Sequence, residues 1–251
     1  MEESQETFLS HLIELRERLV KCLLVFAVAC APTLYFSAEL YDLLAAPLMA
    51  NLPEGSRMIA TGVITPFLIP MKIGFMAALV LVLPFILYQV WAFVAPGLYL
   101  HEKRLALPLV VSSTLLFLAG MVFCYFVVFG GVFRFIATFA PKSISVAPDI
   151  EAYFNFVLGM FLAFGLAFEV PVVVVVLVLM GLVTVAQLRE WRGYVIVAIF
   201  IVAAVVTPPD VVSQIALAVP MCLLYEIGIL LGQGIEKRRK VDTVPGEATQ
   251  D

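Results

Sequence analysis

Apolar and polar residues alternate along this chain in long blocks, and this pattern predicts its elements. Six apolar runs are separated by short polar or proline-containing connections. Most have the length of a membrane-spanning helix, and a lone strand in lipid would leave its backbone without hydrogen-bond partners. All six runs are therefore expected to be helices. Their approximate ranges are 20–36, 73–93, 105–129, 153–178, 194–206 and 211–231.

The fifth run is shorter than a comfortable span. As a helix, residues 194–206 measure about 20 Å, against a hydrocarbon core of about 30 Å. The Thr-Pro-Pro-Asp turn at 207–210 is tight, so the sixth run begins at the same raised depth. We therefore expect the bilayer to be thinned beside this hairpin.

A helical periodicity also marks residues 7–19, ahead of the first run. Its apolar stripe consists of Phe8, Leu12, Leu15 and Leu19. His11, Glu14 and Arg18 share the opposite flank at helical spacing. This pattern is typical of an amphipathic helix at a membrane surface, here leading into the first span. Glu14 would then hold a carboxylate at the water–lipid boundary, where it can receive a cation.

Composition narrows the class to a polytopic membrane protein. Of 251 residues, 63% are hydrophobic and 14% are charged, which is too apolar for a soluble domain of this length. No signal peptide is expected, because the first apolar run follows an acidic start without a cleavage site. The four cysteines lie in apolar runs without metal-ligand spacing, and we interpret them as packing residues.

The distribution of Lys and Arg predicts the orientation. With the N-terminus inside, eleven of these residues fall on the cytoplasmic side and four outside, which satisfies the positive-inside rule. Six spans then place both termini in the cytoplasm. We expect one transmembrane domain at 1–232, a disordered tail at 233–251, and a folded outer cap at 37–65 with a short helix near 40–44.

Glu169 is the most informative polar residue within an apolar run. A lone carboxylate in hydrocarbon costs several kcal/mol unless it is protonated, paired or hydrated. Pro171 removes its own N–H and displaces the Ala167 carbonyl, so a kink is expected here. One interpretation is an acid facing a wet cavity, and the other is a protonated Glu bonded to a neighbouring helix. Glu226 lies near the inner end of the sixth run, where it could simply snorkel.

No arrangement typical of an active site is present. The sequence contains no Walker A, GxSxG or HExxH motif, and we expect no catalysis, cofactor, metal or nucleic acid. A proton- or ion-coupled solute transporter centred on Glu169 is the alternative from another class. Against it stand the lack of an internal repeat and of a second intramembrane charge.

The motifs of this chain resemble those of the TatC family, the signal-receptor subunit of twin-arginine protein translocases, with most likeness to its enterobacterial members. The resemblance covers residues 5–232. The motifs are Ser10-His-Leu-Ile-Glu14-Leu-Arg16-x-Arg18-Leu, Tyr41-Asp-x-x-x-x-Pro47-Leu, Thr65-Pro66-Phe67, Tyr88-Gln-Val-Trp-Ala-Phe93-Val-Ala-Pro96-Gly-Leu, His101-Glu102-Lys-Arg104, Phe164-Gly-x-x-Phe-Glu169-Val-Pro171 and Thr207-Pro-Pro-Asp210-x-x-Ser213-Gln214.

The resemblance implies an all-α fold of six helices in a concave, glove-like arrangement in the bacterial inner membrane. It implies that Glu14 and Glu102 bind the paired arginines of signal peptides, a site that Arg16, Arg18, Phe93 and His101 would complete. Pro47 and Glu169 would be functionally sensitive. The hairpin residues Thr207, Asp210, Ser213 and Gln214 would contact the single-span partners TatA and TatB. The family also implies a multimeric receptor and use of the proton-motive force.

Composition alone leaves Glu102 open to a simpler interpretation, a solvated residue balanced by Lys103 and Arg104. The receptor hypothesis therefore depends on Glu14 and Glu102 converging on one membrane face. A guanidinium matches a carboxylate bidentately, so two acids at a fixed separation can recognise two adjacent arginines better than two lysines.

Overall fold

The structure, a computed structural model, describes residues 2–50, 57–94, 106–139, 147–206 and 211–242. Within these ranges the regular elements are helices, with one isolated bridge between Ile59 and Asp149. In chain order they are α1 (Glu2–Tyr35), α2 (Ser37–Met49), α3 (Thr65–Val94), α4 (Ala106–Phe123), the π-helical turn η3 (Cys124–Val128), α5 (Phe129–Phe139), α6 (Ile150–Phe168), α7 (Val170–Leu179), α8 (Val185–Glu190), α9 (Arg192–Val206) and α10 (Val211–Asp242).

The predicted spans are confirmed by length and composition. Five described stretches are long and apolar enough to cross a membrane: Ser10–Tyr35, Thr65–Val94, Leu107–Arg134, Ile150–Leu179 and Ser213–Lys237. The remaining apolar helix, α9, which is the fifth segment along the chain, is shorter, at 15 residues or about 22 Å. The described chain is therefore an all-α polytopic membrane protein with a short fifth segment, as the hydrophobic pattern predicts.

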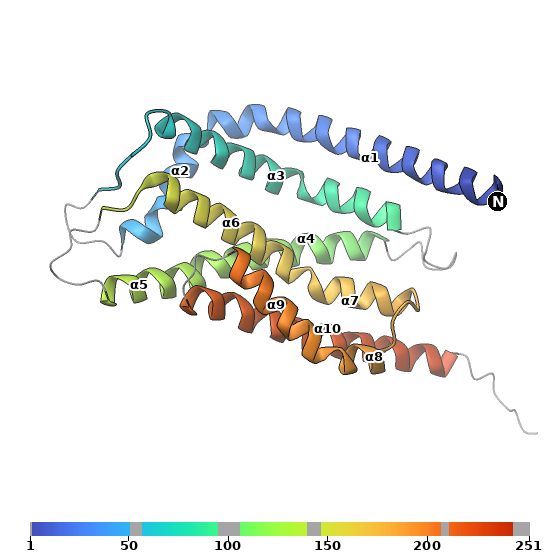
Figure 1. Cartoon of the computed structure of the whole chain (residues 1–251). Coiled ribbons are helices and arrows are strands. Elements are labelled where there is room, and N and C mark those ends of the chain that lie inside the picture. Colours follow the sequence, from blue (N-terminus) through green and yellow to red (C-terminus); the bar gives the residue numbers. More distant parts are fainter. Residues whose placement is uncertain (1, 51–56, 95–105, 140–146, 207–210, 243–251) are drawn as a thin grey trace, which may run out of the picture.

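The long helices lie roughly side by side in layers (Figure 1). α1 packs against α3, α3 against α4, and α4 against α6. α10 packs against α7 and α9 on the other side of the bundle. The N-terminus, the end of α3, the start of α4 and the end of α10 lie at one end (Figure 1). We call it the inner end, after the orientation predicted from the Lys and Arg distribution. α2 and the start of α6 lie at the opposite, outer end.

Close helix contacts depend on glycine. A Cβ added at Gly120 of α4 would lie 2.5 Å from the Phe164 carbonyl oxygen of α6, so only glycine allows this approach. In α10, a Cβ at Gly228 would meet the Pro171 backbone at 3.1 Å, and one at Gly232 would meet Val178 at 3.2 Å. The Gly-x-x-x-Gly pair of α10 therefore packs against α7 of the same chain.

The described helices refine the predicted local structure at three places. The amphipathic residues 7–19 are the first half of α1 and continue without a break into the first span, because no glycine or proline interrupts the chain before Pro32. The tail expected to be disordered from 233 is helical to Asp242, because the good helix formers of its Glu-Lys-Arg-Arg-Lys run extend α10. The inner connection before α9 contains the short helix α8, which a Thr184–Gln187 capping box begins.

The outer cap is confirmed as helical but is longer than predicted, since α2 spans 13 residues. The third run is also longer, continuing through η3 into α5 as far as Phe139. Both underestimates occur where the sequence contains polar or small residues that packing tolerates inside a helix.

Candidate functional site

Arg18 joins the inner ends of α1 and α3 through the carboxylate of Glu14. Its Nη2 and Nε donate to Glu14 Oε1 at 2.6 and 3.0 Å. Its Nη1 donates to Gln89 Oε1 at 2.9 Å, and its Nη2 also approaches the Ala92 carbonyl at 3.4 Å. Gln89 is buried within α3. One guanidinium therefore fixes the rotation of α1 against α3 and the direction in which Glu14 points.

Glu14 keeps part of its binding capacity free for a second cation. Its side chain is 38% exposed, while that of Arg18 is 23% exposed. Both Arg18 contacts use Oε1, and Oε2 lies 4.0 Å from His11 Nδ1, beyond hydrogen-bond distance. A carboxylate has about four acceptor positions. The Arg18 pair therefore orients Glu14 without saturating it.

An aromatic contact completes the inner end of this helix pair. The rings of His11 and Phe93 stack with centroids 4.1 Å apart and an interplanar angle of 19°. His11 Nδ1 lies 4.0 Å from Glu14 Oε2, so the stacked rings and the Arg18 contacts both adjoin the Glu14 carboxylate. Arg16 is exposed on α1.

The sequence analysis places Glu14, Arg18 and Phe93 at one site, and the structure brings these three together. Glu102 and His101 lie outside the described residues. The proximity of Glu102 to Glu14 therefore stays a prediction. Gln89 was not predicted, although a glutamine in an apolar run was a usable signal.

Glu169 lies at the break between α6 and α7. α6 ends at Phe168 and α7 begins at Val170, with the Glu169 amide donating to the Leu166 carbonyl at 3.1 Å. The predicted kink near Pro171 is thus confirmed.

The Glu169 carboxyl group is buried, with 8% of the residue exposed. Among the described residues neither of its oxygens has a hydrogen-bond partner. Ser113, which lies beside it, accepts a hydrogen bond from Trp91 Nε1 at 3.1 Å. A buried carboxyl without a partner is costly, so its presence here needs a specific explanation. The Ser113 hydroxyl of α4 is near enough to influence this carboxyl, and both interpretations from sequence, a wet cavity and a bonded neighbour, stay predictions.

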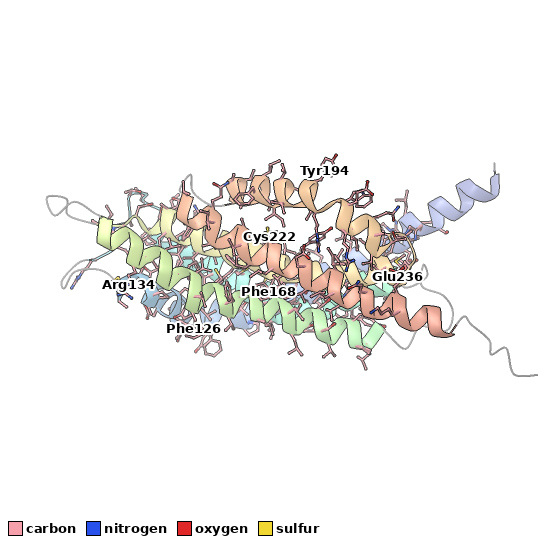
Figure 2. The ribbon with its side chains drawn as sticks, turned by 90° about the horizontal axis from the view of Figure 1, so that it is seen from below. Phe126, Arg134, Phe168, Tyr194, Cys222 and Glu236 are labelled. Carbon is pink, nitrogen blue, oxygen red and sulfur yellow. The ribbon has the colours of Figure 1, made fainter. Side chains whose placement is uncertain are left out.

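The α9–α10 hairpin holds two of the predicted partner-contact residues. Gln214 Nε2 donates to the Phe200 carbonyl of α9 at 3.3 Å, so it ties the two helices together. Ser213 is fully buried within the chain. Thr207 and Asp210 lie outside the described residues. α9 is largely exposed, and Tyr194 points away from the bundle (Figure 2). Contact with a partner helix here stays a prediction.

The inner end of the hairpin is fixed by an ion pair. Arg192 Nη2 donates to Glu226 Oε2 at 2.6 Å, and both side chains are a little under half exposed. Glu226 thus has a structural partner on α9.

Pro47 has a defined effect on the outer cap. It lacks an N–H, so the ordinary helical donor to the Leu43 carbonyl is missing. The Tyr125 hydroxyl donates to that carbonyl at 3.0 Å, and the Tyr153 hydroxyl donates to the next one, of Leu44, at 2.7 Å. Two tyrosines from the bundle therefore hold α2 by its carbonyl groups. The sequence analysis missed both tyrosines.

A polar cluster joins α3 to α6 at the outer end. The Asp149 carboxylate accepts from the Ala152 amide at 3.0 Å and from the Thr61 hydroxyl at 2.8 Å. These donors, the Ala152 amide first, lower the pKa of Asp149. Lys72 Nζ donates to Asn155 at 2.9 Å. Lys72 of α3 thus has a partner on α6.

No group of three or more His, Cys, Asp or Glu side chains that could hold a metal ion is found within the described ranges. The arrangement at the inner end offers acceptors and an aromatic surface, and it contains the elements of a binding site for a cationic, partly apolar segment.

The chain is similar to known proteins over most of its length. Residues 10–220 match the family described as Sec-independent protein translocase protein (TatC). A protein of that name from Azotobacter chroococcum mcd 1 is 52% identical over 231 residues, covering 92% of this chain and 91% of the relative. The TatC of Escherichia coli (strain K12) is 50% identical, covering 92% and 90%.

A solved structure is similar over nearly the whole fold. The crystal structure of a twin arginine translocase receptor, TatC, aligns with a TM-score of 0.81 at 38% identity. The alignment covers 90% of this chain and 99% of that one.

Proposed function

Since this chain belongs to the TatC family of Sec-independent protein translocase proteins, we propose that it is the receptor and core subunit of a twin-arginine translocase. It is a translocase component and not an enzyme, and it is a multi-pass protein of the bacterial inner membrane. In this proposal it binds twin-arginine signal peptides of folded cargo at the cytoplasmic face. It also holds TatA and TatB beside it, and translocation uses the proton-motive force.

The observation that carries the proposal is the state of Glu14. Its carboxylate is oriented by Arg18, remains 38% exposed, and has an oxygen without a contact inside hydrogen-bond distance among the described side chains. An incoming arginine can bind Oε2 while Arg18 keeps Oε1. Arg18 also retains Gln89 and the Ala92 carbonyl, so signal binding need not separate α1 from α3.

The free energies of the individual contacts explain why signal-peptide binding needs two acids and an apolar segment together. An exposed ion pair contributes about 0–1 kcal/mol, and the exposure of Glu14 keeps its contribution near that range. Glu102 would supply a second pair of similar size. Burial of the apolar part of a signal peptide adds about 25 cal/mol per Å², so it supplies most of the affinity while the paired acids supply selectivity.

The exposed face of α9 supports the proposed contact with single-span partners. Phe200, Ile201 and Val205 are 40%, 60% and 81% exposed. α9 is too short to span a bilayer of ordinary thickness, and the Gln214–Phe200 bond keeps its outer half against α10. A partner helix could therefore cover this face and match the raised depth of the hairpin.

The test is signal-peptide binding by the full chain in lipid nanodiscs. Glu14→Lys replaces an attraction by a repulsion, and we expect at least about tenfold weaker binding of a fluorescent twin-arginine peptide. Glu190→Lys, which reverses an exposed acid on α8 at the same end, is the matched control and should bind normally. Equal binding by both variants and the unaltered chain would reject the role of Glu14.

A further inference from the structure

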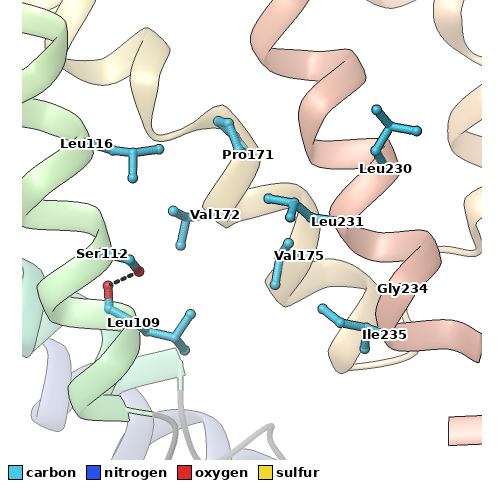
Figure 3. Close-up of a pocket in the computed structure, with 10 residues that line it drawn as sticks. All are labelled: Leu109, Ser112, Leu116, Pro171, Val172, Val175, Leu230, Leu231, Gly234 and Ile235. Carbon is cyan, nitrogen blue, oxygen red and sulfur yellow. Dashed lines mark hydrogen bonds between the residues drawn. The ribbon is translucent and has the colours of Figure 1, made fainter. Parts of the chain in front are cut away.

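A cavity of about 480 Å³ lies between α4, α7 and α10 near the inner end, away from the site of Glu14 (Figure 3). Leu109 and Leu116 of α4, Val172 and Val175 of α7, and Leu231 and Ile235 of α10 line it. Among the described residues that line it, Ser112 alone has a polar side chain, and its hydroxyl donates to the Leu109 carbonyl at 3.0 Å (Figure 3). The cavity therefore suits an apolar occupant.

The α10 wall of the cavity includes side chains that are exposed at the surface of the bundle. Leu230 and Leu231 at its α10 wall are 62% and 52% exposed. Gly234 is exposed, and a Cβ added there would have open space around it within 4 Å. The missing side chain leaves a gap in the α10 wall, through which a chain from the surrounding lipid can enter.

Positive charge lies at the membrane-boundary end of the cavity. The apolar span of α10 ends at Lys237, which is exposed. Lys237 follows Gly234 by three residues and Leu230 by seven, so it continues the same helix face. It also begins the run Lys-Arg-Arg-Lys of residues 237–240. Clusters of four or more cations directly after a span are typical of anionic-lipid binding.

We propose that this cavity binds an anionic phospholipid, with one acyl chain between α4, α7 and α10 and the phosphate beside Lys237. Charge complementarity selects this occupant over a partner helix, because an apolar helix would not need a cation at this depth. The lipid would fill the space between α4 and the packed pair of α7 and α10, and stabilise the region that follows the Glu169 break. The proposal does not depend on signal-peptide binding.

The test is thermal unfolding of the full chain in detergent, titrated with dioleoyl phosphatidylglycerol or with dioleoyl phosphatidylcholine. We expect phosphatidylglycerol to raise the unfolding temperature at lower concentration. In Lys237→Gln its half-effective concentration should rise about five-fold, which matches one cation near a lipid headgroup. Arg189→Gln removes an exposed cation from α8 at the same end and should leave the preference unchanged.

A second variant tests the cavity itself. Gly234→Leu places a side chain in the gap, where a Cβ meets no neighbour within 4 Å. It should therefore exclude the acyl chain and abolish stabilisation by both lipids. Gly193→Leu in α9 also adds a side chain into open space, and should retain it. If Gly234→Leu does not fold, the comparison of Lys237→Gln with Arg189→Gln decides alone. Equal effects of the two lipids on the unaltered chain, or equal responses of those two charge variants, would overturn the proposal.

Discussion

The attachment of the outer cap predicts a coupling between Pro47 and Tyr125. Because Pro47 has no N–H, the Tyr125 hydroxyl replaces the missing donor to the Leu43 carbonyl. Tyr125→Phe leaves that carbonyl to water and should lower the free energy of unfolding by about 0.5–1 kcal/mol, at the low end because the bond is exposed. In a Pro47→Ala background the new alanine amide can donate to Leu43, so the same substitution should cost close to nothing.

The Leu44 carbonyl supplies the internal control. Its helical donor is the amide of Leu48, which Pro47 does not remove. Tyr153→Phe should therefore cost about 1 kcal/mol in both backgrounds, for loss of the 2.7 Å bond from a buried hydroxyl.

The assay is reversible unfolding in mixed micelles, followed by helical circular dichroism for the four members of each double-mutant cycle. A coupling energy of about 0.5–1 kcal/mol is expected for Pro47 with Tyr125, and about zero for Pro47 with Tyr153. Zero coupling for both tyrosines, or equal coupling for both, would refute the interpretation that Pro47 acts by exposing one carbonyl group.

Three further predictions concern packing, pH and the buried acid. Gly120→Ala should destabilise the chain by about 1–3 kcal/mol, because its Cβ would clash with the Phe164 carbonyl. Gly159→Ala adds a Cβ into open space and should be neutral or stabilising. The two variants are compared by their unfolding midpoints. The pKa of Asp149 is lower in the folded chain than in the unfolded chain, so its ionised form stabilises the fold above the ordinary Asp pKa. This stability is lost as the pH falls through the pKa of the folded state. Below about pH 4, Asp149→Asn should therefore show a smaller acid-induced drop in unfolding temperature than the unaltered chain. Glu169→Ala should leave membrane insertion and abundance intact while impairing export of a reporter, and loss of the protein instead would indicate a purely structural role.

Much of the fold follows from the hydrophobic pattern. A run of apolar residues in lipid has few alternatives to a helix, so the positions of the spans could be predicted without tertiary information. The break at Glu169 could also be predicted, because Pro171 disrupts the helix by a local mechanism. The ends of the helices were harder to predict from the sequence. The extension of α10 to Asp242 depends on helix propensity outside the membrane, which hydropathy does not measure.

The contacts within the candidate sites depend on packing between distant segments. Glu14 and Arg18 are four residues apart and could be paired from helical spacing. Gln89, 71 residues from Arg18, could not, because the rotation of α3 against α1 is set by side chains along both helices. The contacts of the Tyr125 and Tyr153 hydroxyl groups with α2 could not be predicted for the same reason. A proline that frees a carbonyl predicts that a donor is needed, but not which residue supplies it.

The central claim is that Glu14 contacts a signal-peptide arginine. The most direct measurement is site-specific photo-crosslinking, with a photoreactive residue at position 14 and, as a control, at position 190, against a peptide labelled beside its arginine pair. We predict crosslinks from position 14 that disappear when both arginines become glutamine, and none from position 190. Crosslinks of equal yield from both positions, or yields at position 14 that do not change without the arginines, would contradict the receptor account.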